Sequence, residues 1–154
     1  MAIGYQRVLK IWPAIGEIGS SAALASGAYV SGAAIICDGF DNATLYVEYT
    51  RGGAAGEQDF RVMFSPSETG GDWFQEILLE PGALTPGTVA DDLVQEKRNR
   101  YVPLAAGLQS FEYEIENLRA NRIRVDAREI GDGVDPGTAR ILLMLGHGGK
   151  ATKR

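Results

Sequence analysis

The chain has almost none of the side chains that carry nucleophilic, acid–base or zinc chemistry. Its 154 residues include one cysteine, Cys37, and one histidine, His147. A lone cysteine excludes an intrachain disulfide, and a structural zinc site takes four Cys or His ligands. Nucleophilic catalysis needs a base beside the nucleophile, and the sequence has no Gly-x-Ser-x-Gly turn. We therefore expect a protein that is not an enzyme and has no catalytic residues, cofactor or metal.

The sequence also lacks a continuous apolar run of the roughly 18 residues that a membrane-spanning helix needs. Its first residues do not follow the basic, apolar and cleavage-site order of a signal peptide. We therefore expect a soluble protein that is made in a cytoplasm and has no membrane partner.

Basic residues are too scattered for a protein that wraps nucleic acid. The formal net charge is −5, and the one basic cluster is Lys150, Lys153 and Arg154. Because phosphate binding needs a clustered Lys/Arg surface, we expect no nucleic-acid partner. Residues 147–154 are interpreted as a basic tail, for which solvation is favoured over contact with an acidic partner.

Three further candidates for chemistry have simpler explanations. Asp38 and Asp41 lack the residue order of a calcium-binding EF-hand loop, so a solvent-facing turn is expected there. Glu112 and Glu114 fall on the outward side of a predicted strand and read as solubilising charge. Cys37 ends an apolar run and is expected to be a small buried hydrophobe.

Strand patterns fill most of the chain. Residues 42–76 predict an antiparallel meander of three strands, because apolar and polar residues alternate between turns rich in Gly, Pro and Asp. Strands are also predicted at about 27–37, 111–115, 121–130 and 138–145, whereas residues 88–100 fit either a short helix or a strand with a loop. About eight strands and no confident long helix predict an all-β, two-sheet antiparallel β-sandwich. We favour a jelly-roll-like order and rank an immunoglobulin-like order second.

The last strands carry informative faces. Residues 111–115 have an outward Glu row and residues 121–130 an outward Arg row, which can pair if these strands are antiparallel neighbours. In the last strand, Ala139 to Leu145 form a core face at alternate positions, but Leu142 and Met144 make the opposite face apolar too. A strand that is apolar on both faces is covered on both sides. The cover is either the N-terminal segment or another subunit.

Residues 1–26 are interpreted as an N-terminal arm before a sandwich domain at 27–146. Pro13, Gly16 and Gly19 interrupt any long helix, yet the segment is too apolar to be left in water. Either it folds back over a sheet edge, or it reaches a neighbouring subunit. The residues proposed for a partner interface are those of the arm and of the apolar outer face of the last strand: Tyr5, Leu9, Ile11, Trp12, Ile15, Leu142 and Met144.

A family resemblance rests on the order of several stretches. They are a Gly/Ala-rich first strand, DNATLYVEYT (41–50), RVMFS (61–65), WFQE (73–76), RIRV (122–125) and PGT (136–138). Over about residues 27–146 the chain resembles small bacteriophage structural proteins, above all capsid decoration (cement) proteins with a jelly-roll β-sandwich.

The resemblance implies a virion protein, made in the host cytoplasm, that stabilises the outer capsid surface through contacts between subunits. It further implies a homotrimer that binds the major capsid protein and has arms that reach neighbouring subunits. Related sandwich domains occur in phage tail, baseplate and head-completion proteins, which keeps those locations open. A carbohydrate-binding module is a further alternative, with Trp12, Tyr46 and Trp73 as stacking platforms, although a core position in a strand is favoured for Trp73.

Overall fold

Every regular element that the structure describes is a β-strand. The computed structural model describes residues 7–75, 77–80, 93–96, 99–103, 105–131 and 135–147. The strands are β1 (Arg7–Trp12), β2 (Ala22–Ala23), β3 (Val30–Ser31), β4 (Ile35–Ile36), β5 (Asn42–Thr50), β6 (Glu57–Ser65), β7 (Phe74–Gln75), β8 (Ile77–Glu80), β9 (Leu93–Glu96), β10 (Asn99–Tyr101), β11 (Leu108–Ile115), β12 (Arg122–Ile130) and β13 (Thr138–Gly146).

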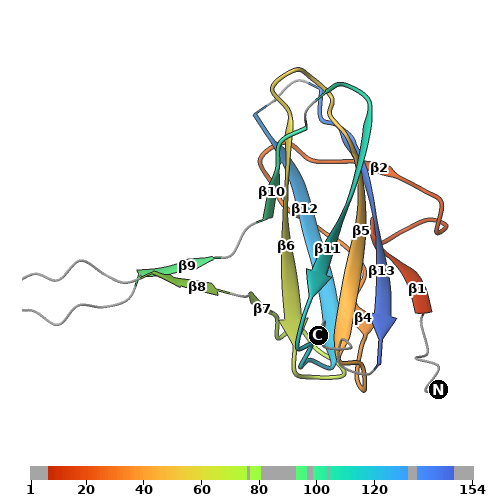
Figure 1. Cartoon of the computed structure of the whole chain (residues 1–154), viewed down its shortest axis with the longest axis vertical. Coiled ribbons are helices and arrows are strands. Elements are labelled where there is room, and N and C mark those ends of the chain that lie inside the picture. The colour runs from red at the N-terminus through yellow and green to blue at the C-terminus, as the bar shows by residue number, and fades with distance from the viewer. Residues whose placement is uncertain are drawn as a thin grey trace, which may run out of the picture.

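Two antiparallel sheets pack face to face, as the prediction of a β-sandwich required (Figure 1). The first sheet has the order β1-β13-β5-β11, with β2 also on β13. The second has the order β10-β6-β12-β3, with β4 on β12 and β7 on β6. If β3 and β4 count as one interrupted strand, and β2, β7, β8 and β9 are set aside, eight strands remain. In chain order they run first-eighth-third-sixth in one sheet and second-seventh-fourth-fifth in the other, which is jelly-roll connectivity.

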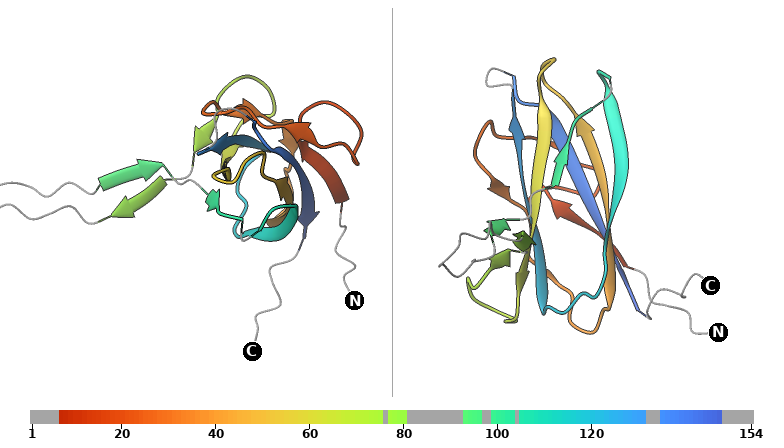
Figure 2. Two further views of the ribbon diagram at one scale, coloured as in Figure 1. Left: turned by 90° about the horizontal axis from the view of Figure 1, so that it is seen from above. Right: turned by 60° about the vertical axis from the view of Figure 1, so that its left-hand side comes forward.

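The two sheets face each other (Figure 2). The core lies between them, because the alternation of each long strand turns its apolar residues toward the other sheet. Val47 of β5, Ile141 of β13 and Val125 of β12 all belong to this core and are almost completely buried. The inward row predicted for the last strand is confirmed: Ala139, Ile141, Leu143 and Leu145 are each at most 1% exposed.

The predicted meander is wrong at its first turn. β5 and β6 lie in different sheets, and the Gly-rich turn between them crosses from one sheet to the other. Only β6 and β7 pair as antiparallel neighbours, from Met63↔Gln75 to Phe64↔Phe74. The alternation is the same for a strand paired with its chain neighbour or with a distant strand, so it could not distinguish them.

The predicted pairing of the Glu and Arg rows is also wrong. β11 pairs with β5 and β12 pairs with β6, so the two rows lie on different sheets. Two arginines of β12 are instead paired within their own sheet: Arg124 binds Asp126, as does Arg61 of β6, and Arg128 binds Asp59 at 2.7 Å. These Asp side chains are almost fully buried, so they anchor the arginines in one arrangement along the sheet.

The N-terminal segment belongs to the sandwich from residue 7 onward. β1 pairs with β13 from Arg7↔Leu145 to Trp12↔Ile141 and forms an edge of the first sheet. Ile11 and Trp12 are 0% exposed, and the Trp12 indole Nε1 donates a hydrogen bond to the Val30 carbonyl at 2.9 Å. The predicted boundary at residue 26 therefore does not separate an arm from the domain, and the segment folds back on its own chain.

The strand predicted at 27–37 is interrupted. β3 and β4 both pair with β12, and Gly32 lies between them, where its amide donates to the Val125 carbonyl at 2.7 Å. A Cβ at Gly32 would lie 2.1 Å from the Ile11 carbonyl oxygen, so the backbones approach too closely for any other residue. The amide of Ala33 donates a hydrogen bond to the Ile11 carbonyl, which links β1 of the first sheet to the segment between β3 and β4 of the second.

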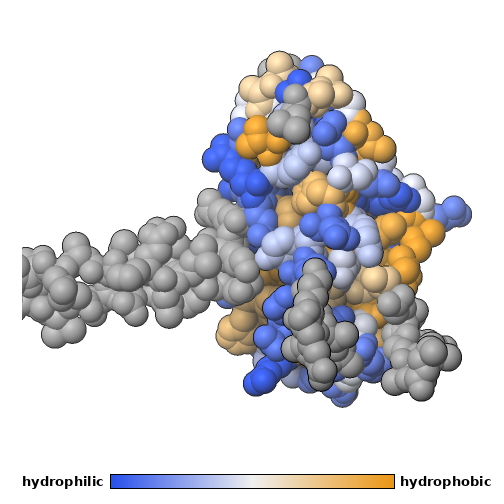
Figure 3. All heavy atoms as spheres, viewed as in Figure 1, coloured by the Kyte–Doolittle hydropathy of each residue, from blue (hydrophilic) through white to orange (hydrophobic). Residues whose placement is uncertain are grey.

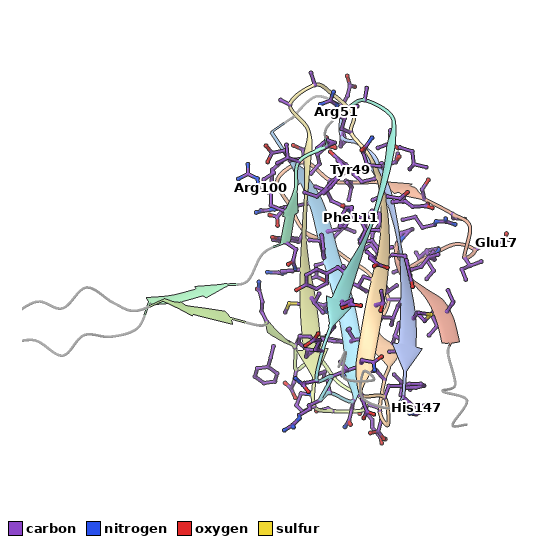
Figure 4. The ribbon with its side chains drawn as sticks, viewed as in Figure 1. Glu17, Tyr49, Arg51, Arg100, Phe111 and His147 are labelled. Carbon is purple, nitrogen blue, oxygen red and sulfur yellow. The ribbon has the colours of Figure 1, made fainter. Side chains whose placement is uncertain are left out.

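A buried carboxylate holds the loops at one end of the sandwich together. Glu129 is 0% exposed, and its Oε2 accepts hydrogen bonds from the Tyr49 hydroxyl at 2.6 Å and from the Gly137 amide at 2.8 Å. Figure 4 shows Tyr49 inside the sandwich near the turn that carries Arg51. Burial, followed by the hydrogen bond to Glu129, raises the pKa of Tyr49 well above its usual value.

We expect this tyrosine to make the fold sensitive to alkali. The folded protein keeps the Tyr49 proton where the unfolded chain, with a tyrosine pKa of about 10, loses it. The stabilisation is therefore complete below about pH 10 and declines as the pH rises further. Urea unfolding at about pH 8 to 11 should show a smaller decline for Tyr49→Phe than for the wild type. Parallel declines would contradict the role of this hydroxyl.

One element leaves the sandwich. β8 and β9 pair only with each other within the described chain, from Ile77↔Glu96 to Glu80↔Leu93, and form a two-stranded ribbon that projects away from both sheets (Figure 1). We call β8 and β9 the ribbon. Of residues 88–100, 93–96 and 99–100 belong to strands, and residues 88–92, 97 and 98 lie outside the described residues. The ribbon is inserted in the connection between β6 and β10.

Candidate interaction surface

The outer face of the first sheet has an apolar centre. The strand register places Val8, Met144 and Thr44 side by side in one row, and Lys10, Leu142 and Tyr46 in the next. Val8 is 48% exposed and Tyr46 37%, while Leu142 and Met144 are half-buried between them. We call this group, Val8, Tyr46, Leu142 and Met144, the outer patch.

The partner-interface residues proposed from the sequence fall into separate places. Leu142 and Met144 lie on the outer patch, as the apolar second face of the last strand predicted. The prediction that Ile11 and Trp12 contact a neighbour is wrong. Both side chains are buried in the core, because β1 is hydrogen-bonded into the first sheet. Leu9 is partly buried against the same core. Tyr5 lies outside the described residues.

Of the arm residues that were proposed for the interface and that the structure describes, Ile15 is the one that is exposed. It is 87% exposed and lies in the loop between β1 and β2, in which Ile18 is 53% exposed. Lys10 Nζ donates to the Ile15 carbonyl at 2.6 Å and Arg140 to the Ile18 carbonyl at 3.3 Å, so side chains of the outer face hold this loop. Figure 3 shows hydrophobic residues on the side of the molecule where β1 and its loop lie.

Acidic residues border the outer patch on the β11 side. Glu112 is opposite Tyr46 and Glu114 is opposite Thr44, and both glutamates are exposed. A polar rim around an apolar centre is the usual arrangement of a protein–protein contact surface. The predicted outward direction of this Glu row is therefore confirmed, although it has no arginine row beside it.

The ribbon is the second candidate contact element, and the sequence reasoning missed it. Five of its eight residues are apolar in sequence, at positions 77–79 and 93–94. A lone two-stranded ribbon is marginally stable in water, since it has no sheet or helix to pack against. The signal was present in these two apolar runs, but residues 80–87 between them read only as a turn-rich connection.

The aromatic residues considered for sugar stacking are not arranged as a platform. Trp12 is buried in the core. The core position predicted for Trp73 is wrong, because its side chain is only partly buried. Its ring stacks with the guanidinium groups of Arg122 and Arg124, which lie 4.9 and 4.6 Å from the ring centre. Tyr46 alone remains accessible, on the outer patch.

The groups considered for chemistry lie apart from one another. Cys37 is buried, as predicted, and burial together with Asp38 raises the pKa of its thiol to about 11, so the thiolate is disfavoured. His147 stacks on Phe40 with ring centres 4.4 Å apart. The described residues contain no group of three or more His, Cys, Asp or Glu side chains placed to hold a metal. They also contain no helix of the length and hydrophobicity needed to cross a membrane.

No protein-family model, curated protein or solved structure matches this chain.

Proposed function

We propose that this chain is a non-enzymatic virion structural protein, a capsid decoration protein that stabilises the outer capsid surface through inter-subunit contacts. The jelly-roll order of the two sheets supports the proposal, because this architecture is common among viral capsid domains. A fold by itself does not define a function, so the argument rests on the surfaces that the fold presents.

The observation that carries the proposal is the projecting ribbon. β8 pairs with β9 and, within the described chain, with no strand of either sheet. A two-stranded ribbon with no further strand or helix beside it is marginally stable in water, so contact with a partner surface would stabilise it. In this proposal the ribbon reaches a neighbouring subunit, which is one of the two roles that the sequence left open for the N-terminal segment.

The outer patch supplies a second contact on a different part of the molecule. A stable protein–protein interface buries on the order of 1,200 to 2,000 Å² in total, more than one small patch provides. Two contact elements on one subunit can engage two neighbours, and several linked contacts add avidity. This arrangement supports a homotrimer seated on the major capsid protein, the assembly that we propose.

Deletion of the ribbon tests the proposal. We expect a chain in which a short Gly-Ser linker replaces residues 76–98 to keep the sandwich but to lose self-association and binding to expanded, empty phage heads. Analytical ultracentrifugation and co-sedimentation with heads measure the two effects, and NMR verifies the fold. Undiminished association and head binding by the folded deletion variant would remove the ribbon from the mechanism.

Charge substitutions separate the outer patch from the ribbon. Val8→Lys with Tyr46→Lys should weaken head binding, because both side chains are accessible and a desolvated lysine opposes an apolar contact. Ile36→Lys is the matched control, since Ile36 is 65% exposed on the other sheet. Localisation by electron microscopy distinguishes the capsid surface from a tail, baseplate or head-completion position.

A further inference from the structure

A cavity of about 390 Å³ opens on the outer face of the first sheet, where the Glu48–Arg140 row follows the Tyr46–Leu142 row of the outer patch. Thr50 of β5 and Thr138 of β13 are direct neighbours in its floor, and Ser21 belongs to the loop that forms one wall. Leu108, opposite Thr50 on β11 and 63% exposed, forms the other wall. This volume lies within the range of about 300 to 1,000 Å³ that is typical of small-molecule sites.

The charged groups of the cavity neutralise each other. Arg140 binds Glu48 through two parallel hydrogen bonds, Nε to Oε2 at 2.8 Å and Nη2 to Oε1 at 2.7 Å. A free anion would meet the Glu48 carboxylate, and a free cation would meet the Arg140 guanidinium. The pair therefore disfavours ions, yet each carboxylate oxygen keeps a lone pair that can accept a further hydrogen bond.

Three hydroxyl groups complete the polar lining. The side chains of Ser21, Thr50 and Thr138 have no hydrogen-bond partner within the described part of the chain. Each hydroxyl can both donate and accept a hydrogen bond. The wall behind them is fixed, because Arg140 also donates from Nη1 to the Ile18 carbonyl in the loop that carries Ser21.

We propose that this cavity binds a neutral polyhydroxylated ligand, a hexopyranose sugar. Vicinal sugar hydroxyls can donate to Glu48 and exchange hydrogen bonds with the hydroxyls of Thr50 and Thr138, while the apolar face of the ring packs on Leu108. The site does not involve the aromatic residues that sugar-binding modules use for stacking. Free monosaccharide and the end of a longer glycan share this chemistry.

An NMR titration of the full-length protein tests the site. The probes are neutral methyl hexopyranosides of glucose, galactose, mannose and N-acetylglucosamine, with inorganic phosphate as the charged comparison. We expect saturable shifts confined to the amides around Thr50, Leu108 and Thr138 with at least one glycoside, and none with phosphate. Oligosaccharides of the same sugar distinguish the two sources, since only a glycan-end site gains affinity with chain length.

Two isosteric substitutions make the test specific. Thr50→Val with Thr138→Val keeps β-branched residues in both strands and should weaken sugar binding about tenfold or more, because two hydrogen bonds are lost. Thr44→Val, on the same face of β5 beside the outer patch, is the matched control and should bind as the wild type does. Absence of saturable shifts with every glycoside, shifts located elsewhere, preferred binding of phosphate, or unchanged binding by the double variant would each overturn the proposal.

Discussion

Replacing Glu129 with alanine is expected to lower the free energy of unfolding by about 2 to 5 kcal/mol, because it leaves buried donors unpaired. The Tyr49 hydroxyl and the Gly137 amide both donate to Glu129 Oε2, and neither site is open to water. The carboxylate also connects the turn after β5 to the segment before β13 across the end of the sandwich. Urea unfolding followed by tryptophan fluorescence measures the loss.

Two further variants determine which property of Glu129 matters. Glu129→Gln keeps an acceptor oxygen of the same shape, so it should lose less stability than the alanine variant. Glu112→Ala removes an exposed glutamate from β11 and should leave the unfolding midpoint unchanged. An alanine variant at position 129 that unfolds with the wild-type midpoint would show that the buried carboxylate does not hold the two loops.

Replacing Trp12 with alanine is expected to cost about 3 to 5 kcal/mol, the usual range for a large aromatic side chain removed from a core. Trp12 is completely buried, and the substitution also removes the donor to the Val30 carbonyl. That hydrogen bond joins β1 of one sheet to β3 of the other. Thermal unfolding of the two proteins under identical conditions measures the difference.

Ile15→Ala is the matched control for Trp12. Ile15 lies three residues further along the same segment but is 87% exposed, so its truncation should leave the thermal midpoint unchanged. The opposite ranking of the two variants would mean that the segment lies free of its own domain. Truncation of residues 1–20 would delete the edge strand β1 and the buried Ile11 and Trp12, so we expect it to unfold the sandwich.

Local pattern was sufficient for the fold class but not for the connectivity. The alternation in residues 44–50, 60–64, 122–128 and 139–145 located the inward faces of β5, β6, β12 and β13, and the structure confirms them. The pairing of β5 with β13 and β11, rather than with β6, joins residues about 60 to 100 positions apart. Strand periodicity contains no information on such partners.

The candidate surfaces, too, could be predicted from the sequence only in part. Leu142 and Met144 were found from the sequence because they break the alternation of polar and apolar residues in the last strand. Val8 joined them only through the register of β1 on β13, which nothing local to residue 8 indicates. The sugar-sized cavity could not be predicted from the sequence for the same reason, because its lining comes from four separate parts of the chain.

The sequence by itself determined that this chain is an all-β sandwich with a well-defined core and a second, apolar face on its last strand. Those properties follow from residue types and their period of two, which act within a single strand. Only the tertiary structure decided that the N-terminal segment is an edge strand and that β8 and β9 form the projecting element. An apolar segment must be buried somewhere, but which surface covers it depends on the shape of the whole fold, because hydrophobic burial has no preferred direction.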